Sequence, residues 1–147
     1  MNRKLYIGFK GKYNSSSILV RSISADSYLL TNSFVGLKRD IDSLGDVYDN
    51  VILIGIDKNL KDAVRIETVA ENGTTEFSAF DIENISTRLN QAGIKNYLSN
   101  KPTKYLCNNA YWHLLRKYNR NVVLLHIPSI KNLDECFIES MKQALTQ

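Results

Sequence analysis

The chain has few of the residues that build metal centres or disulfide frameworks, with only two cysteines and two histidines among 147 residues. These four candidates, Cys107, His113, His126 and Cys136, are scattered without the short spacings of zinc sites, so we expect no metal and no cofactor. The apolar run after the basic N-terminus is too short for a signal peptide, and no run approaches the length of a membrane span. We therefore expect a cytoplasmic protein with reduced thiols and no membrane contact.

Charge of one sign is also not concentrated anywhere along the chain. The net charge is +4, and the densest basic cluster lies at residues 116–120, at the expected end of a helix, where cations suit the helix dipole. No nucleic-acid motif accompanies this cluster, so a nucleic-acid partner is not expected. The sequence also lacks internal repeats, low-complexity stretches and linkers. Its length then predicts one domain over residues 1–147.

Apolar runs of strand length alternate with helical patterns throughout. Strands are predicted at residues 5–9, 28–30, 51–56, 63–70, 95–98 and 121–126, with a turn at Asn72-Gly73. Helices are predicted to begin near Asn14 or Ser15, at Ser33, at Ser78 with Asp81, near Cys107, and at Asn132 with Glu135. The Ser33 helix turns Val35, Leu37, Ile41 and Leu44 inward. The alternation predicts a three-layer α/β/α sandwich with a mixed, mainly parallel sheet.

Two residues stand where a thiol enzyme would need them. Cys107 lies at the expected start of a helix, where the positive end of the helix dipole lowers a thiol pKa and favours the thiolate. His126 closes a buried strand and can be aimed into a cleft as a general base. In such folds chemistry gathers beyond the strand ends.

Several segments together resemble a known family, pyroglutamyl peptidase I, which is a family of cysteine peptidases that remove N-terminal pyroglutamate. The resemblance runs through residues 76–78, 89–94 and 99–100 to Tyr105-Leu106-Cys107-Asn108, and into Leu124-Leu125-His126-Ile127-Pro128. Upstream, residues 65–72 are similar to the family's glutamate motif, and Gly8-Phe9 with Asn14-Ser15-Ser16 are similar to its N-terminal motif. The ordered set spans nearly the whole chain.

This resemblance implies a Glu-Cys-His triad formed by Glu67, Cys107 and His126. Cys107 would attack an acyl carbon, His126 would take the thiol proton and later protonate the leaving amine, and Glu67 would orient the imidazole. We expect these three side chains to converge, with the sulfur near enough to an imidazole nitrogen to hydrogen-bond. The implied partner is a small peptide or another small amide ligand.

The resemblance also implies substrate contacts, although the specificity loops are cut back. Phe9 and Tyr105 match aromatic contact positions, Leu106 adjoins Tyr105, and Tyr13 substitutes for a lost aromatic of the first loop, which is shortened to residues 10–13. Ile56 stands where the family often has a polar ligand-binding side chain. Thr68 replaces the arginine that usually follows the catalytic glutamate, and an Arg-Ile-Pro-Asp-Asn segment is absent. The reaction type is thus implied more firmly than the substrate.

Simpler explanations stand beside the enzymatic one. Free cysteine is among the most buried residue types, so Cys107 alone fits a core position, and Cys136 is expected to pack in the core of the last helix. His113 is expected on the exposed or rim side of its helix, and Tyr111 and Trp112 fit either an oligomer surface or the edge of the core. Three hypotheses follow: a cysteine peptidase, a binding or sequestering protein on the same scaffold, and a structural or interaction protein, with a homo-oligomer possible.

Overall fold

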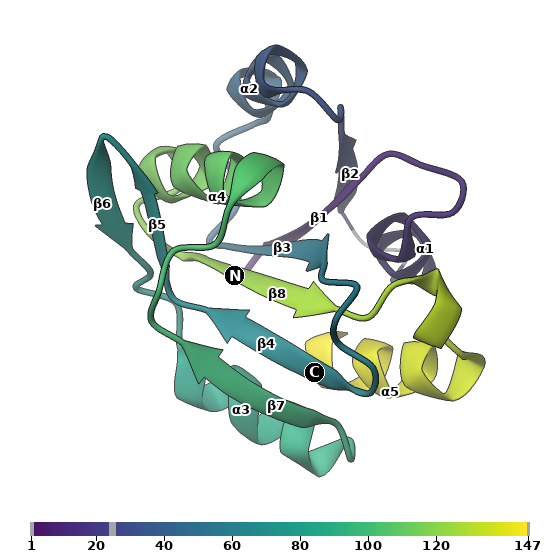
Figure 1. Ribbon diagram of the computed structural model, residues 1–147. Helices are drawn as coiled ribbons and strands as arrows, with labels where there is room; N and C mark the ends of the chain where they lie inside the picture. The colour runs from purple at the N-terminus through teal and green to yellow at the C-terminus, as the bar shows by residue number, and fades with distance from the viewer. Residues whose placement is uncertain (1, 24–25, 147) are drawn as a thin grey trace.

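A mixed sheet forms the centre of the computed structural model, which describes residues 2–23 and 26–146 (Figure 1). Six strands make up this sheet in the order β2-β1-β3-β8-β4-β7. Their bounds are β1 (Lys4–Phe9), β2 (Ser27–Leu30), β3 (Asn50–Ile56), β4 (Ala63–Glu67), β7 (Lys95–Ser99) and β8 (Val122–Ile127). β4 runs antiparallel to β8, whereas the other four neighbouring pairs are parallel. The predicted mixed, mainly parallel sheet is confirmed.

Helices cover both faces of this sheet. They are α1 (Ser15–Ser22), α2 (Phe34–Ser43), α3 (Ile82–Gln91), α4 (Tyr105–Lys117) and α5 (Glu135–Thr146). Two apolar clusters show which helix lies on which face: one joins the sheet to α1, α3 and α5, and the other joins it to α2 and α4. The fold is therefore a three-layer α/β/α sandwich, as the alternation of elements predicts.

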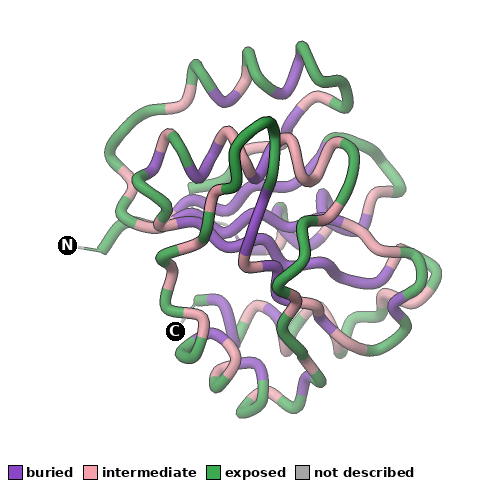
Figure 2. The backbone as a smooth tube through the Cα atoms, turned by 60° about the vertical axis from the view of Figure 1, so that its left-hand side comes forward, coloured by how far each residue is buried: buried purple, intermediate pink, exposed green. Residues whose placement is uncertain are grey.

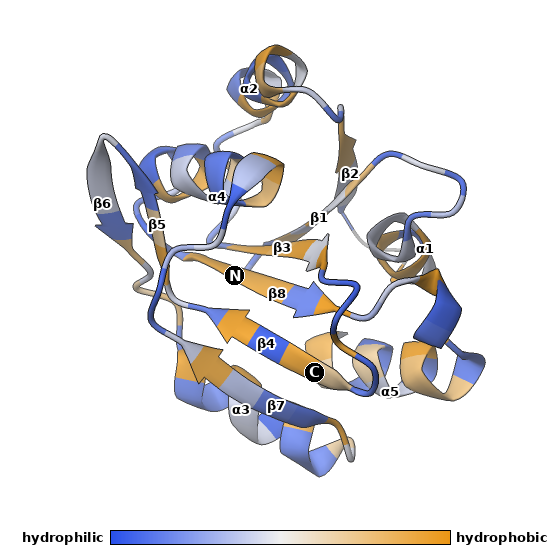
Figure 3. Cartoon of the chain, in the orientation of Figure 1, coloured by the Kyte–Doolittle hydropathy of each residue, from blue (hydrophilic) through white to orange (hydrophobic). Residues whose placement is uncertain are grey.

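The central strands are buried on both sides because they lie between these two clusters. In β3, Ile52 and Ile54 belong to one cluster and Val51 and Leu53 to the other, as the alternation of side chains along a strand requires. Figure 2 shows the buried tube running through the strands, and Figure 3 shows β3 and β8 as mostly apolar beside helices of mixed character. Continuous apolar runs are typical of parallel strands covered on both faces.

Side-chain caps define where the helices begin. The Asn14 side chain accepts hydrogen bonds at α1, and the Ser33 hydroxyl accepts one from the Gly36 amide at α2, as predicted. The prediction that Ser78 caps α3 is wrong, because Asp81 accepts the capping bond from the Asn84 amide. The Ser78 hydroxyl instead donates to the Val122 carbonyl oxygen at 2.6 Å, which ties the loop to β8.

Two further predictions about helices are wrong. The cap of α5 is not Asn132: the Phe137 amide donates to the Asp134 carboxylate, and a short 3-10 helix, Ile130–Asn132, precedes it. Val35 does not face inward, since its side chain is 77% exposed. It lies two residues from buried Leu37, and a step of two turns a helical side chain to nearly the opposite side.

The predicted strand over residues 63–70 is divided at Thr68. β4 ends at Glu67, and β5 (Val69–Asn72) leaves the central sheet to pair with β6 (Thr74–Phe77), which the sequence patterns did not reveal. The predicted turn is present, with Gly73 at a φ of 79°. This hairpin packs against α4, where the Trp112 indole N–H donates to the Thr74 carbonyl oxygen at 3.0 Å.

Candidate functional site

A row of neighbouring residues across four strands forms the floor of the candidate site. His126 of β8 lies beside Gly55 of β3 on one side and beside Arg65 of β4 on the other. Arg65 in turn lies beside Tyr97 of the edge strand β7. Residues paired across strands point to the same face of a sheet, so this register brings a histidine and an arginine into contact.

His126 is held by a carboxylate. Its Nδ1 atom lies 2.8 Å from Oε2 of Glu67, and the side chains of both residues are at most 3% exposed. Glu67 comes two residues after Arg65 on β4 and therefore points to the same face. Because an ionised carboxylate only accepts hydrogen bonds, we assign the ring proton to Nδ1, which leaves the lone pair of Nε2 free.

The Cys107 sulfur lies on the Nε2 side of the imidazole, and both groups lie next to Gly55. A Cβ atom added at Gly55 would lie 2.7 Å from Sγ of Cys107 and 3.3 Å from Nε2 of His126. The missing side chain therefore creates the space that the sulfur and the imidazole share. The sequence carries a signal for this role, because a glycine inside a buried strand often marks a site where another group approaches the backbone closely. The hydrogen bond between sulfur and imidazole stays a prediction.

The prediction of a low pKa for Cys107 is wrong. Burial raises the pKa of the thiol to about 11, and the charge of Glu67 adds to the rise. The Ile56 backbone N–H donates toward the sulfur and works in the opposite direction, as does the positive charge of Arg65, but neither outweighs desolvation. A helix N-terminus lowers a thiol pKa only where the thiolate keeps enough solvation, and here the thiol is packed between α4 and the sheet.

Arg65 and Asp57 belong to the same group of side chains and were not identified from the sequence. The Arg65 guanidinium donates from Nε to Glu67 Oε2 at 2.5 Å and from Nη1 to Asp57 Oδ2 at 2.6 Å. Its Nη2 atom lies 3.3 Å from Nδ1 of His126. Burial alone would raise the pKa of Glu67, but the hydrogen bonds from His126 and Arg65 bring this pKa below its usual value.

These groups open onto a pocket of about 670 Å³ beyond the carboxyl end of β3. Its lining comprises Ile56, Asp57, Lys58, Asn59, Arg65, Pro102, Thr103, Lys104, Tyr105, Leu106, Cys107 and His126. Three of the predicted substrate contacts, Ile56, Tyr105 and Leu106, thus lie at the pocket. The volume suits a small ligand.

The other two predicted contacts do not line this pocket. Phe9 is buried in the apolar cluster between the sheet and the α2–α4 layer, because it ends a fully covered strand. Tyr13 is 71% exposed in the loop before α1, where Lys12 lies over its ring. The structure therefore assigns Phe9 to the core and Tyr13 to the surface.

The backbone is strained just before Cys107. Tyr105 has a φ of 61°, in the left-handed region that L-residues with large side chains rarely adopt, and its side chain is 80% exposed. Such a conformation costs about 1–3 kcal/mol and is typical of functional sites. The strained residue makes the turn from the 100–104 loop into α4, which directs Cys107 toward the sheet.

The remaining candidates have simpler environments. Cys136 is exposed rather than packed in the core, because it lies on the solvent side of α5. Tyr111 is fully buried, and its hydroxyl donates to the Glu67 carbonyl oxygen at 2.8 Å, so it supports the site from the core. His113 is partly buried and packs edge-on against Trp112. Among residues 2–23 and 26–146, no group of three side chains could hold a metal ion.

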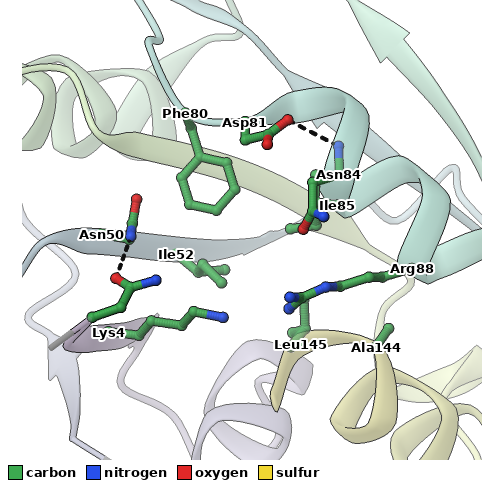
Figure 4. Close-up of a pocket in the computed structure, with 11 residues that line it drawn as sticks. Lys4, Asn50, Ile52, Phe80, Asp81, Asn84, Ile85, Arg88, Ala144 and Leu145 are labelled. Carbon is green, nitrogen blue, oxygen red and sulfur yellow. Dashed lines mark hydrogen bonds between the residues drawn. The ribbon is translucent and has the colours of Figure 1, made fainter. Parts of the chain in front are cut away.

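A second pocket, of about 240 Å³, lies at the amino ends of β1 and β3. Figure 4 shows Lys4 and Arg88 reaching toward each other from opposite sides, with Ile52 and Phe80 above them in this view. The pocket contains no cysteine or histidine among its described lining residues. No helix in the described part of the chain is long and apolar enough to span a membrane.

Comparison with known proteins gives a clear result for structure only. No protein-family model matches the sequence, and no curated protein matches it. Among solved structures, pyrrolidone carboxyl peptidase from Thermus thermophilus matches with a TM-score of 0.80 over 97% of each chain at 17% identity. Pyrrolidone carboxyl peptidase from Thermococcus litoralis has a TM-score of 0.77 at 16% identity and covers 99% of this chain and 92% of its own.

A third match has the same extent. Pyroglutamyl peptidase I from Bacillus amyloliquefaciens has a TM-score of 0.77 at 15% identity, over 98% of this chain and 95% of its own. The similarity in backbone therefore runs nearly from end to end, while the sequences have diverged widely. This chain has the fold of the pyrrolidone carboxyl peptidases, which is the fold that its sequence resemblance implied.

Proposed function

We propose that this protein is a cysteine peptidase or amidohydrolase of the pyroglutamyl peptidase type, which cleaves an N-terminal pyroglutamyl or similar small cyclic amide group. One observation carries the proposal: Cys107 Sγ and His126 Nε2 both border the space above Gly55, and Glu67 holds the far side of the imidazole at 2.8 Å. The proposed nucleophile Cys107 and base His126 line a pocket that is large enough for a small ligand, and Glu67 contacts the base. The shared fold supports the same reaction.

In the proposed reaction, His126 Nε2 takes the thiol proton while Cys107 Sγ attacks the carbonyl carbon of the substrate amide. The unpaired backbone N–H groups in the first turn of α4 are suitable donors to the negative oxygen that forms. His126 then gives its proton to the leaving nitrogen, and a thioester remains on Cys107. Water attacks this thioester with His126 again as base, and the acid product leaves.

The pocket supports a small substrate with one apolar side. Ile56 and Leu106 offer apolar contacts, and Tyr105 at the strained turn offers an aromatic side chain near Cys107. Because Phe9 and Tyr13 do not line the pocket, the substrate ring would be held by fewer aromatic contacts than the resemblance implies. We expect weaker discrimination as a result, since positioning groups supply much of the binding energy used in catalysis.

A second function, binding without turnover, is favoured by one observation. The pKa of Cys107 is raised to about 11, so that the free thiol is predominantly protonated at neutral pH. A sequestering protein needs the pocket but not a reactive thiolate. The two functions differ in whether Cys107 becomes covalently acylated.

The test is hydrolysis of a pyroglutamyl reporter amide by the wild type, by Cys107→Ala and by Cys136→Ser. Cys136 is an exposed thiol that does not line the pocket, and it serves as a matched control for loss of a cysteine. We expect the wild type and Cys136→Ser to release the reporter at equal rates and Cys107→Ala to release none. Turnover by Cys107→Ala at the wild-type rate would exclude the thiol mechanism. Tight binding of the reporter by an inert wild type would establish the sequestering function instead.

A further inference from the structure

The carboxylate that orients His126 is shared with a second cation. One oxygen of Glu67, Oε2, accepts from His126 Nδ1 at 2.8 Å and from Arg65 Nε at 2.5 Å. Arg65 therefore competes with the imidazole for the same negative charge. The proposed triad consists of Glu67, His126 and Cys107, so the arginine requires a separate explanation.

Arg65 is held in place from three directions. It lies two residues before Glu67 on β4, so both side chains point to the same face of the sheet. Its Nη1 atom donates to Asp57 just after β3, and Asp57 is itself fixed by the Asn59 amide at 2.9 Å. Across the sheet, Tyr97 of β7 lies beside Arg65 in the strand register. The cation is thus part of the rigid floor of the pocket.

This position brings a positive charge against the imidazole. Arg65 Nη2 lies 3.3 Å from His126 Nδ1. When Nδ1 donates its proton to Glu67, it has no lone pair left to accept a bond from Arg65. The guanidinium then contacts the ring without a hydrogen bond, and it repels any positive charge that the ring acquires.

Transfer of the Cys107 proton to His126 is the step that this contact affects. The transfer breaks the S–H bond, forms an N–H bond at Nε2 and leaves the summed charge of the pair at zero. It moves positive charge onto the ring that Arg65 touches, whereas Glu67 and Asp57 favour that charge. On the α4 side, Cys107 faces the ring and carries the negative charge after the transfer. Gly55 of β3 has no charged side chain. Lys58 and Lys104 line the pocket and add two further positive charges.

We propose that Arg65 is a positioning residue that ties Glu67 to Asp57 and keeps the resting Cys107–His126 pair in its uncharged thiol–imidazole form. The inference rests on the proposed function for its biological meaning, but its test does not require turnover. The charge of Arg65 also lowers the pKa of the Cys107 thiol, whose rise comes from burial. The guanidinium contacts the imidazole directly, at 3.3 Å, so its repulsion of the imidazolium is the larger effect on the pair. Loss of the positive charge at Arg65 should therefore favour the thiolate–imidazolium pair.

The test measures the rate of alkylation of Cys107 by iodoacetamide between pH 5 and pH 9, in a Cys136→Ser background so that one thiol reacts. Arg65→Gln keeps hydrogen-bonding groups for Glu67 and Asp57 but removes the charge, and Arg65→Lys keeps the charge. We expect Arg65→Gln to react about tenfold faster than the parent at pH 7, which corresponds to about one pKa unit. Arg65→Lys should react at a rate closer to the parent than to Arg65→Gln, because the cation is retained although the fork that joins Glu67 to Asp57 is lost.

A second measurement covers the case in which Arg65→Gln does not fold. Asp57→Asn removes one of the two carboxylates that balance Arg65 and leaves its positive charge against the ring, so Cys107 should be alkylated more slowly than in the parent at pH 7. Identical alkylation profiles for folded Arg65→Gln and the parent would overturn the inference, and so would alkylation of Asp57→Asn at the parent rate or faster.

The proposed function can fail separately. Faster alkylation of Arg65→Gln together with no hydrolysis of any reporter amide would leave the role of Arg65 standing and remove the peptidase. Hydrolysis of a reporter amide together with identical alkylation profiles for Arg65→Gln and the parent would support the peptidase and remove the role of Arg65.

Discussion

A pocket lies at each end of the central sheet, and the two pockets differ in how their charged side chains are positioned. At the carboxyl ends of β3 and β8, the side chains that face the pocket are placed by strand register: His126 lies beside Gly55 and Arg65, and Glu67 follows Arg65 by two residues. At the amino ends of β1 and β3, Lys4 and Arg88 meet from a strand end and a helix surface. In the first arrangement, strand register fixes the charged side chains relative to one another; in the second, register places Lys4 beside Asn50 but does not place it relative to Arg88.

The difference lies in what each pocket can do chemically. The carboxyl-end pocket combines a thiol, an imidazole and a carboxylate, groups that can exchange protons in a fixed geometry. In the amino-end pocket, burial and the nearby charge of Arg88 both lower the pKa of Lys4, which marks a cationic environment without a nucleophile–base pair. We therefore expect substitutions to affect turnover strongly at one end of the sheet and weakly at the other.

Apart from the loss of Cys107 itself, the largest effect is expected for His126→Ala. This change removes the proposed base for Cys107 and the partner of Glu67. Turnover of a pyroglutamyl reporter amide should fall by roughly 10³-fold or more, because groups that act as one unit lose most of their effect when one is removed. The measurement is kcat/KM with circular dichroism as a check on folding. Retention of more than a tenth of the wild-type activity by His126→Ala would show that the imidazole is not the base.

The next effect is expected for Gly55→Ala. The new Cβ would lie 2.7 Å from the Cys107 sulfur, so the thiol and the imidazole must move apart. We expect a loss of about 1–3 kcal/mol in the free energy of unfolding and about 100-fold in turnover. Gly45→Ala is the matched control, since a Cβ there meets no atom within 4 Å. Equal effects of the two substitutions would mean that the space above Gly55 is not critical.

A smaller effect is expected for Glu67→Gln, in which an acceptor oxygen remains for His126 but the negative charge is lost. Turnover should fall by about tenfold, which is less than for His126→Ala because an orienting group contributes less than the group it positions. The pKa of Glu67 is lowered on folding, so its carboxylate stabilises the protein at pH values above its unfolded pKa of about 4.3, and this contribution is lost as the pH falls through the folded pKa.

Thermal unfolding at two pH values measures this contribution of Glu67. The wild type should exceed Glu67→Gln in Tm at pH 7, and the difference should shrink at pH 3. A difference that stayed constant between the two pH values would show that the glutamate charge does not stabilise the fold.

The smallest effect is expected for Arg88→Ala at the amino-end pocket. Turnover should remain within about twofold of the wild type, because substitutions at distant sites without shared partners act independently. The same change should raise the pKa of Lys4, since the charge of Arg88 contributes to its lowering. An NMR titration of the lysine measures that shift. A tenfold loss of turnover in Arg88→Ala would show that the two ends of the sheet are coupled.

Residue patterns predicted the elements of the fold well wherever the pattern was local. The apolar runs at residues 5–9, 51–56 and 121–126 became the buried strands β1, β3 and β8, and the helical spacing after Cys107 became α4. Errors arose where a partner far along the chain decided the outcome. The predicted strand over residues 63–70 breaks at Thr68, whose amide donates to the Ser99 carbonyl oxygen.

The candidate site divides in the same way. The residue types of Glu67, Cys107 and His126 and their order along the chain were available from the sequence and its resemblance. The roles of Gly55 and Arg65 were not, because both depend on which residues lie beside His126 in the neighbouring strands. The place of Phe9 in the core was not available from the sequence for a related reason, since its burial depends on the helix layer that covers it.

The sequence by itself determined the α/β/α layering and the presence of a thiol, an imidazole and a carboxylate, because periodicity and residue chemistry are local properties. Tertiary structure decided the protonation of the thiol and the hydrogen-bond partners of Glu67. Desolvation between α4 and the sheet raises the pKa of Cys107, and the antiparallel register of β4 with β8 brings Arg65 against His126. Both effects depend on distances between segments far apart in the chain, which the order of residues does not specify.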